Sequence, residues 1–157
     1  MNSETGKNTR PTVWVLVADS AQARLFSANL RNGSLTEEER LENPEARMHE
    51  GDFATAARGH LVGGKRGSHM GGHSAADDHS AKKQSSDEFA RKVGESVHRA
   101  RLVGAVERLY LIAEPRFLGE LREHLDEPTR RLVVSEIGRS LVGLTPAEIR
   151  EHLPAVL

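Results

Sequence analysis

The chain has 157 residues, of which 37% are hydrophobic and 29% are charged, values typical of a soluble globular protein with one domain. Its 22 basic and 23 acidic side chains nearly cancel, so net charge offers no general attraction to nucleic acid or to a membrane, and electrostatic recognition has to be local. The sequence contains no cysteine, which excludes disulfides, thiolate metal sites and cysteine nucleophiles. Residues 1–11 are polar and lack the apolar segment of a signal peptide, so we expect a disordered tail, a cytoplasmic location and no membrane partner.

The first third of the chain predicts a meander of three strands. The segments are Thr12–Ala18, Ala23–Ala28 and Leu35–Leu41. The first is a continuous β-branched and aliphatic run, which is typical of a strand buried on both faces. Asp19–Gln22 is predicted to form the first turn, and Asn32-Gly33 is a strong hairpin signal. A helix over Ala21–Leu30 is the alternative for the second strand.

The second half of the chain predicts helices that alternate with strands. Ser85 and Glu88 form a capping-box pattern, which places the start of a helix at this point. Gly104 is of a type that commonly ends helices. Between them runs one apolar stripe at helical spacing, made of Phe89, Val93, Val97 and Ala100.

The remaining elements are shorter. Leu109–Ala113 is predicted to be a strand, and a helix follows from Pro115 to Leu125. Leu132–Ile137 is either a last strand or the end of a helix. A cap, a first-turn proline and a capping-box glutamate over Thr145–Glu148 predict a final short helix. The order of elements predicts a single α/β domain over residues 12–157, a sandwich with a mixed sheet.

Residues 43–84 are predicted to form a long flexible loop between these two parts. The segment holds half of the 14 glycines and most of the eight histidines, and it shows no periodicity. A structureless stretch of this length inside a compact domain is usually functional or disordered. The loop is therefore a candidate for a functional site.

A histidine cluster in this loop offers ligands for zinc or a similar ion. The ligand set is His69, His73, His79, Asp77 and Asp78. Gly71 and Gly72 disfavour a helix that would align the first two histidines, and no second shell is evident. Weak metal binding is therefore the third alternative for the function of the chain, and no cofactor is expected.

Three stretches of the sequence resemble a known bacterial family. They are VWVLVADSAQARLFSANL, FARKVGESVHRA and RLYLIAEPRFLGELREHL, and the resemblance extends from about Val13 to Leu153, including LTPAEIREHL. The family is that of proteins required for attachment to host cells, which in turn looks like the middle domain of eukaryotic and archaeal peptide-chain release factors and of Pelota. This resemblance implies an α/β domain in which a long exposed loop precedes a basic helix.

In release factors that loop carries a Gly-Gly-Gln tip, and the corresponding residues here are Gly71, Gly72 and His73. The resemblance implies that these three residues form a catalytic tip that hydrolyses a peptidyl-tRNA ester. Paired glycines let the backbone approach a crowded ester, and a backbone amide can stabilise the developing oxyanion. Histidine replaces glutamine here, and it can act as a general base near neutral pH.

Basic residues in the loop and on the following helix form a candidate surface for RNA phosphates. They are Lys65, Arg66, Lys82, Lys83, Arg91, Lys92 and Arg99. Because acidic residues are interspersed among them, an ordinary solvated helix face is the alternative.

The leading functional hypothesis is a cytoplasmic protein that acts at the ribosome or on tRNA, with the loop as its probe. The rival is a non-catalytic interaction or regulatory module whose loop becomes ordered on a protein partner. DNA is not an expected partner.

Overall fold

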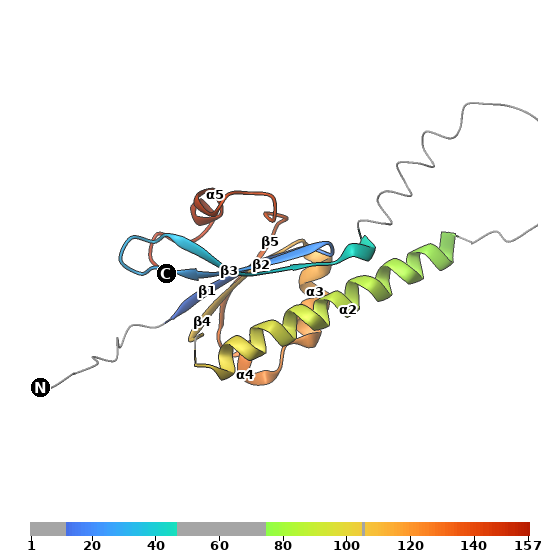
Figure 1. The fold of residues 1–157 in the computed structure, drawn as a ribbon, viewed down its shortest axis with the longest axis horizontal. Coiled ribbons are helices and arrows are strands. Elements are labelled where there is room, and N and C mark those ends of the chain that lie inside the picture. Colours follow the sequence, from blue (N-terminus) through green and yellow to red (C-terminus); the bar gives the residue numbers. More distant parts are fainter. Residues whose placement is uncertain (1–11, 47–74, 105) are drawn as a thin grey trace, which may run out of the picture.

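In the computed structural model, residues 12–46, 75–104 and 106–157 are described. Five strands form one mixed sheet in the order β3-β2-β1-β4-β5 (Figure 1). The sheet confirms the predicted α/β class. Its strands are β1 (Val13–Ala18), β2 (Gln22–Ala28), β3 (Leu35–Glu42), β4 (Arg108–Ala113) and β5 (Val133–Gly138).

The strand directions bring several strand ends to one edge of the sheet. β1 pairs antiparallel with β2, and β2 antiparallel with β3, whereas β1–β4 and β4–β5 are parallel pairs. Consequently β1, β3, β4 and β5 all run in the same direction and end at the same edge. We call this the carboxyl edge of the sheet.

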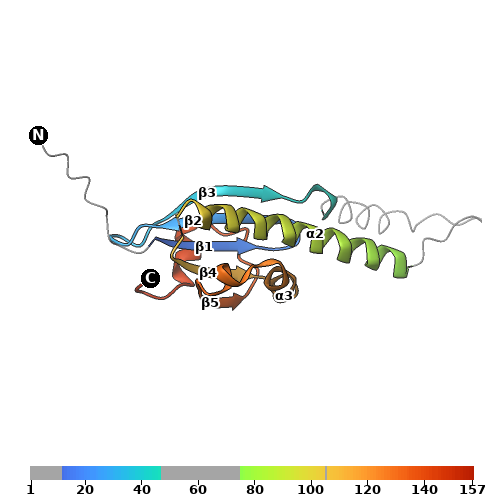
Figure 2. The same cartoon turned by 90° about the horizontal axis from the view of Figure 1, so that it is seen from below.

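Helices cover one face of the sheet, and the C-terminal segment covers the other (Figures 1 and 2). On the first face, α2 packs with α3 over β1 and β4. The second face is covered by residues 139–157, which contain α5. The helices are α2 (Ala75–Leu102), α3 (Pro115–His124), α4 (Glu127–Arg130) and α5 (Pro146–Glu151).

The predicted apolar stripe of α2 forms the centre of the first core. Phe89, Val93 and Val97 are each at most 3% exposed, against Leu16 and Leu111 of the sheet. An aromatic contact with α3 adds to this core: the ring centroid of Phe117 lies 5.8 Å from that of Phe89. This packing fixes how α2 lies on the sheet.

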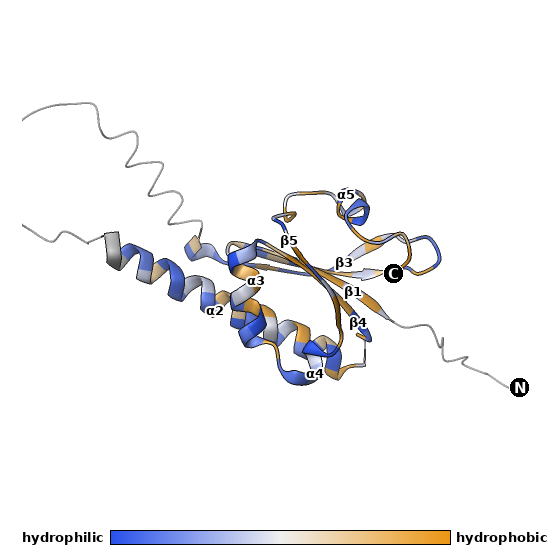
Figure 3. Cartoon of the chain, turned by 180° about the vertical axis from the view of Figure 1, so that it is seen from behind, coloured by the Kyte–Doolittle hydropathy of each residue, from blue (hydrophilic) through white to orange (hydrophobic). Residues whose placement is uncertain are grey.

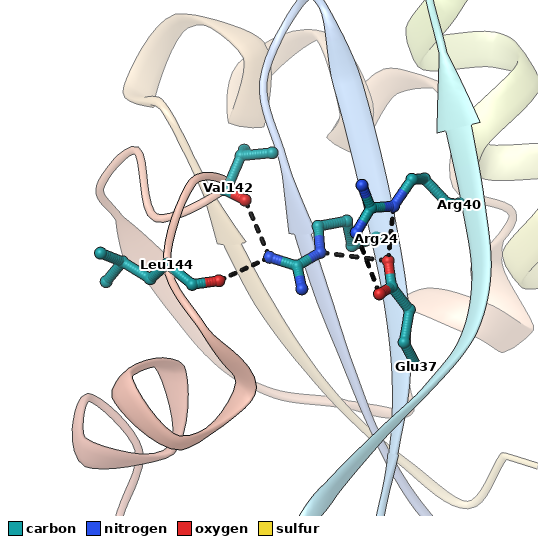
Figure 4. Close-up of polar contacts among 5 residues, drawn as sticks. All are labelled: Arg24, Glu37, Arg40, Val142 and Leu144. Atoms are coloured by element: carbon teal, nitrogen blue, oxygen red, sulfur yellow. Dashed lines mark hydrogen bonds and ion pairs between the residues drawn. The ribbon is translucent and has the colours of Figure 1, made fainter.

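A buried arginine holds the C-terminal segment on the second face (Figure 4). Arg24 on β2 is 6% exposed and donates hydrogen bonds to the carbonyls of Val142, at 2.9 Å, and Leu144, at 2.6 Å. Its Nε lies 3.1 Å from Glu37 Oε1, and Arg40 Nε lies 2.8 Å from the same oxygen. The hydrogen bond from Arg40, followed by that from Arg24, lowers the pKa of Glu37 to about 2 against the opposing effect of desolvation.

The predicted start of the long helix at Ser85 is wrong, because α2 begins ten residues earlier, at Ala75. Residues 75–84 contain no glycine or proline, and Asp78 near the start of the helix suits the positive end of the helix dipole. Ser85 instead lies inside the helix and is buried, where its Oγ accepts a hydrogen bond from Asn43 Nδ2 at 3.1 Å. The loop prediction for 43–84 is therefore wrong at 75–84 and at the helical residues 44–46, while 47–74 lie outside the described residues.

The other predicted elements are largely confirmed. The three strands of the meander are present, so the helix over Ala21–Leu30 is wrong, and Leu132–Ile137 contributes β5. The capping box of α5 forms between Thr145 and Glu148. Gly104 follows the end of α2 with a positive φ of 74°. The tail at 1–11 lies outside the described residues.

Besides the helical residues 44–46, α4 was not expected from the sequence. α4 is a single turn in which Asp126 serves as the N-cap, its carboxylate accepting from the amide of Thr129 at 3.1 Å. Asp126 and Pro128 are residues typical of a helix start. The helix was missed because only a few residues separate this signal from β5.

Candidate functional site

A pocket of about 230 Å³ opens at the carboxyl edge of the sheet. Its walls come from the segments that follow β1, β3 and β4, and from the sides of α2 and α3. In α/β folds, ligands commonly bind in the crevice outside the carboxyl ends of parallel strands. The pocket lies at such a place, beyond the ends of β1, β3 and β4.

Asn43 joins three elements at one wall of the pocket. It follows β3, and its Nδ2 donates to the carbonyl of Ser20, at 3.0 Å, and to Ser85 Oγ of α2. Its backbone N–H donates to the carbonyl of Ala21 at 2.8 Å. The turn after β1 is itself held by Asp19, whose Oδ1 accepts from two following amides at 2.8 Å. Asn43 therefore fixes this wall through tertiary contacts.

Two carboxylates line the pocket, and both have partners within the protein. Glu114 follows β4 and is the N-cap of α3, where its two oxygens accept from the amides of Arg116 and Phe117, each at 3.2 Å. Glu120, nearly two turns further along α3, accepts a hydrogen bond from Ser86 Oγ at its Oε2. The contact of Glu120 links α3 to α2, whereas the cap contacts of Glu114 orient its carboxylate at the start of α3.

The pocket also gathers cationic side chains from two helices. Lys82 and Lys83 come from α2 and Arg116 from α3, with His79 beside them. Lys83 and Arg116 are exposed, and within the described part of the chain neither forms an ion pair. Their charges are thus available to an anionic ligand.

The spacing along α2 explains why these residues converge. His79, Lys82, Lys83 and Ser86 recur at i, i+3, i+4 and i+7, so they share one face of the helix, and that face continues into the apolar stripe. Figures 1 and 3 show that the N-terminal part of α2 extends beyond the sheet and is hydrophilic, whereas the part over the sheet carries the hydrophobic residues. We call residues 78–86 the overhang and residues 89–102 the anchored half of α2.

The structure separates the basic residues that the sequence grouped as an RNA surface. Lys82 and Lys83 lie at the pocket, as described. Arg91 pairs with Glu95 at 2.6 Å, and Arg99 lies 3.8 Å from Glu39 of β3. Lys92 is exposed and, among the described residues, has no ion pair. It is nine residues from Lys83, about 900° of helical rotation, and so lies on the opposite side of α2.

The whole predicted catalytic tip, two of the five predicted metal ligands and two of the predicted RNA contacts lie outside the described residues. The tip is Gly71, Gly72 and His73, the two ligands are His69 and His73, and the RNA contacts are Lys65 and Arg66. His79 is described and lies at the pocket. Among the described residues, no group of three or more histidine and carboxylate side chains is arranged to hold a metal ion.

Several pocket residues were missed by the sequence analysis. They are Ser20, Asn43, Glu114, Arg116 and Glu120. Three of them follow a strand directly or within two residues, a position where functional groups are common in α/β folds. Their convergence depends on the order of strands in the sheet, which local sequence patterns do not reveal.

Fold and pocket together define an α/β protein with one mixed sheet and a cationic pocket at the carboxyl edge of that sheet. Residues 14–153 match the family model described as "protein required for attachment to host cells", and the chain belongs to this family, as its sequence predicted. A comparison with curated proteins finds no match. Within the described residues, no helix is both long and apolar enough to cross a membrane.

Among solved structures, the chain is similar to the type II variant of the Ppx/GppA phosphatase from Aquifex aeolicus. Sequence identity is 15% and the TM-score is 0.36. The alignment covers 82% of this chain but only 35% of the phosphatase chain, so this chain spans about a third of that protein. At this level of similarity we carry no activity, substrate or partner across.

Proposed function

We propose that this member of the host attachment family is a cytoplasmic RNA-binding protein that acts at the ribosome or on tRNA. The observation that carries the proposal is the pair Lys83 and Arg116. They come from different helices, flank one pocket, and have no acidic partner among the described residues. Arginine and lysine placed in this way are the usual contacts to phosphate groups.

The distribution of charge supports an anionic partner at this edge in particular. The net charge of the chain is −1, so cations are not in general excess. Elsewhere on α2, Arg91 and Arg99 pair with glutamates and Arg101 pairs with Asp126. At the pocket both glutamates already accept hydrogen bonds from the protein. Phosphate contacts of this kind give affinity that falls steeply with salt.

The resemblance to release-factor middle domains favours RNA of the translation machinery as the partner. It also suggests the finer proposal that Gly71, Gly72 and His73 hydrolyse a peptidyl-tRNA ester. Binding at the pocket does not depend on that step. Loss of peptidyl-tRNA hydrolysis in His73→Ala, with activity retained in His152→Ala at the C-cap of α5, is the result expected for a catalytic tip; equal activity in both variants would contradict it.

The test of RNA binding is co-sedimentation with ribosomes together with fluorescence anisotropy on tRNA, each at several salt concentrations. The double variant Lys83→Glu/Arg116→Glu should lose at least tenfold in affinity. For single-stranded sites, the slope of log affinity against log salt should fall by about 1.4, because each lost phosphate contact removes about 0.7.

Lys92→Glu is the matched control, since it makes the same change on the opposite side of the same helix. It should bind nearly as well as the wild type. An equal loss in Lys92→Glu, or no binding at low salt, would contradict the proposal. Co-sedimentation that persists at high salt and after ribonuclease treatment would instead favour the rival function, an interaction module with a protein partner.

A further inference from the structure

The polar groups of the pocket differ in kind between its mouth and its floor. The exposed positions are cationic, with Lys83 on one side and Arg116 on the other. Lys82 is a third, half-buried cation, and the other buried and half-buried polar positions are neutral or acidic: they include Asn43, Ser86 and Glu120. A ligand that suits both parts has an anionic end and a hydrogen-bond-donating end.

Glu120 is the acceptor on this floor with capacity to spare. In the described part of the chain it accepts one hydrogen bond, from Ser86 to Oε2, which leaves Oε1 without a partner. Asn43 uses both hydrogens of its Nδ2 within the protein, so its Oδ1 is the group it can offer to a ligand. A half-buried carboxylate repels phosphate but accepts from hydroxyl groups, so it would orient a ligand with its phosphate toward the mouth.

Hydroxyls that pair with a carboxylate, together with a phosphate that pairs with lysine and arginine, are the chemistry of a ribose phosphate. Carboxylate recognition of ribose hydroxyls is the established solution in dinucleotide-binding folds. The volume of about 230 Å³ is smaller than the roughly 300–1,000 Å³ of pockets for drug-sized ligands. It therefore suits one sugar-phosphate unit, with the base left outside.

We propose that the pocket at the carboxyl edge holds one ribose-phosphate unit of a bound RNA, with Glu120 accepting from the 2′-hydroxyl and with Lys83 and Arg116 on the phosphate. The proposal rests on the RNA-binding function and deepens it, because it assigns the choice of RNA over DNA to one side chain. The 2′-hydroxyl is the group by which a protein distinguishes the two at a given site.

The experiment compares three single-stranded oligonucleotides of one sequence: RNA, DNA, and RNA with 2′-O-methyl groups. Affinities are measured by fluorescence anisotropy at one salt concentration. The wild type should bind RNA about tenfold or more tightly than DNA, the effect of one hydrogen bond to a charged group. The 2′-O-methyl RNA should bind like DNA, because its methyl group replaces the donor hydrogen.

Two variants separate the two parts of the pocket. Glu120→Ala should bring the ratio of RNA to DNA affinity close to one. Lys83→Met should weaken the binding of both RNA and DNA and leave the ratio unchanged. Glu123→Gln, an exposed carboxylate on the same helix, is the control and should keep the wild-type ratio. Thermal unfolding of each variant checks that its fold is intact.

Each outcome is informative. RNA and DNA bound equally by the wild type would overturn the ribose proposal and leave RNA binding in place, whereas binding of neither would overturn both. A preference for RNA that survives in Glu120→Ala would place the recognition of the 2′-hydroxyl elsewhere and would overturn the assignment. As a readout without a polymer, ribose 5-phosphate should shift the NMR signals of the His79 ring more than 2-deoxyribose 5-phosphate does; equal shifts would count against the assignment.

Discussion

The overhang and the anchored half of α2 present the same face of the helix, but that face contacts different surroundings in each. In the anchored half the face is apolar and buried against the sheet, as at Val93, which is fully buried. In the overhang the same face is polar, and it lines a pocket instead of a core. The candidate site therefore arises where the helix continues past the edge of the sheet, and a single regular element provides both the core and the ligand contacts.

The largest expected difference between the two halves concerns side-chain truncation. Phe89→Ala should lower the free energy of unfolding by about 3–5 kcal/mol, because the ring is 3% exposed and packs against Phe117. Lys83→Ala in the overhang should change it by less than about 0.5 kcal/mol. Chemical denaturation measures both. Comparable losses in the two variants would mean that the overhang contributes to the core after all.

A smaller effect is expected where the anchored half crosses α3. A Cβ on Gly94 would lie 2.8 Å from the backbone oxygen of His124, closer than a carbon and an oxygen normally approach. Gly94→Ala should therefore destabilise by about 1–3 kcal/mol, although it improves helix propensity. Gly119→Ala on α3 is the control, since its Cβ meets nothing within 4 Å, and it should stabilise by about 0.5–1 kcal/mol. Stabilisation by both changes would show that the helices can separate at no cost.

Acid should weaken the sheet that supports the anchored half. The pKa of Glu37 is lowered from 4.5 to about 2, so its charged form stabilises the folded state fully above pH 4.5. This contribution is lost as the pH falls from 4.5 toward 2, and we expect it to be about 1–2 kcal/mol for a partly exposed group. Unfolding titrations should show that Glu37→Gln is less stable than the wild type at pH 7 and less sensitive to acid in that range. An unchanged acid dependence in the variant would exclude Glu37 as the source.

Strands β1 and β4 could be predicted from the sequence because nearly all of their residues are buried, on both faces of the sheet. β1 reads as a continuous apolar run, and Asn32-Gly33 fixes the hairpin between β2 and β3. The start of α2 was mispredicted because Ser85 and Glu88 match a cap pattern that can also occur inside a helix. The contact that buries Ser85 there comes from Asn43, which is 42 residues away in the chain.

The candidate site was predictable in part, for similar reasons. Lys82 and Lys83 stand out by charge alone. Ser20, Asn43 and Glu114 acquire a common role only through the strand order, which places the ends of β1, β3 and β4 at one edge. Glu120 is placed in the candidate site by a single hydrogen bond from Ser86 on another helix. Such convergence is a tertiary property, so local spacing did not reveal it.

The smallest expected effect tests directly whether the overhang is independent of the core. Ala81 and Ala90 lie on either side of the boundary in α2; the first is exposed and the second fully buried. Glycine lowers helix propensity by about 1 kcal/mol at both positions, and at Ala90 it also removes a buried methyl group. Ala90→Gly should therefore reduce the free energy of global unfolding by about 1–2 kcal/mol. Ala81→Gly should leave it unchanged within about 0.5 kcal/mol, because an element with few buried contacts can open locally without unfolding the rest.

Amide hydrogen exchange along α2 distinguishes local from global opening. In Ala81→Gly, exchange should accelerate in the overhang alone, and RNA affinity should fall by a few fold, because Lys82 and Lys83 then have to be ordered on binding. A loss of global stability equal to that of Ala90→Gly would show that the overhang and the anchored half unfold as one unit. In that case the pocket would be as rigid as the core, and its cations would be preorganised for the ligand by the whole fold and not by a locally stable stretch of helix.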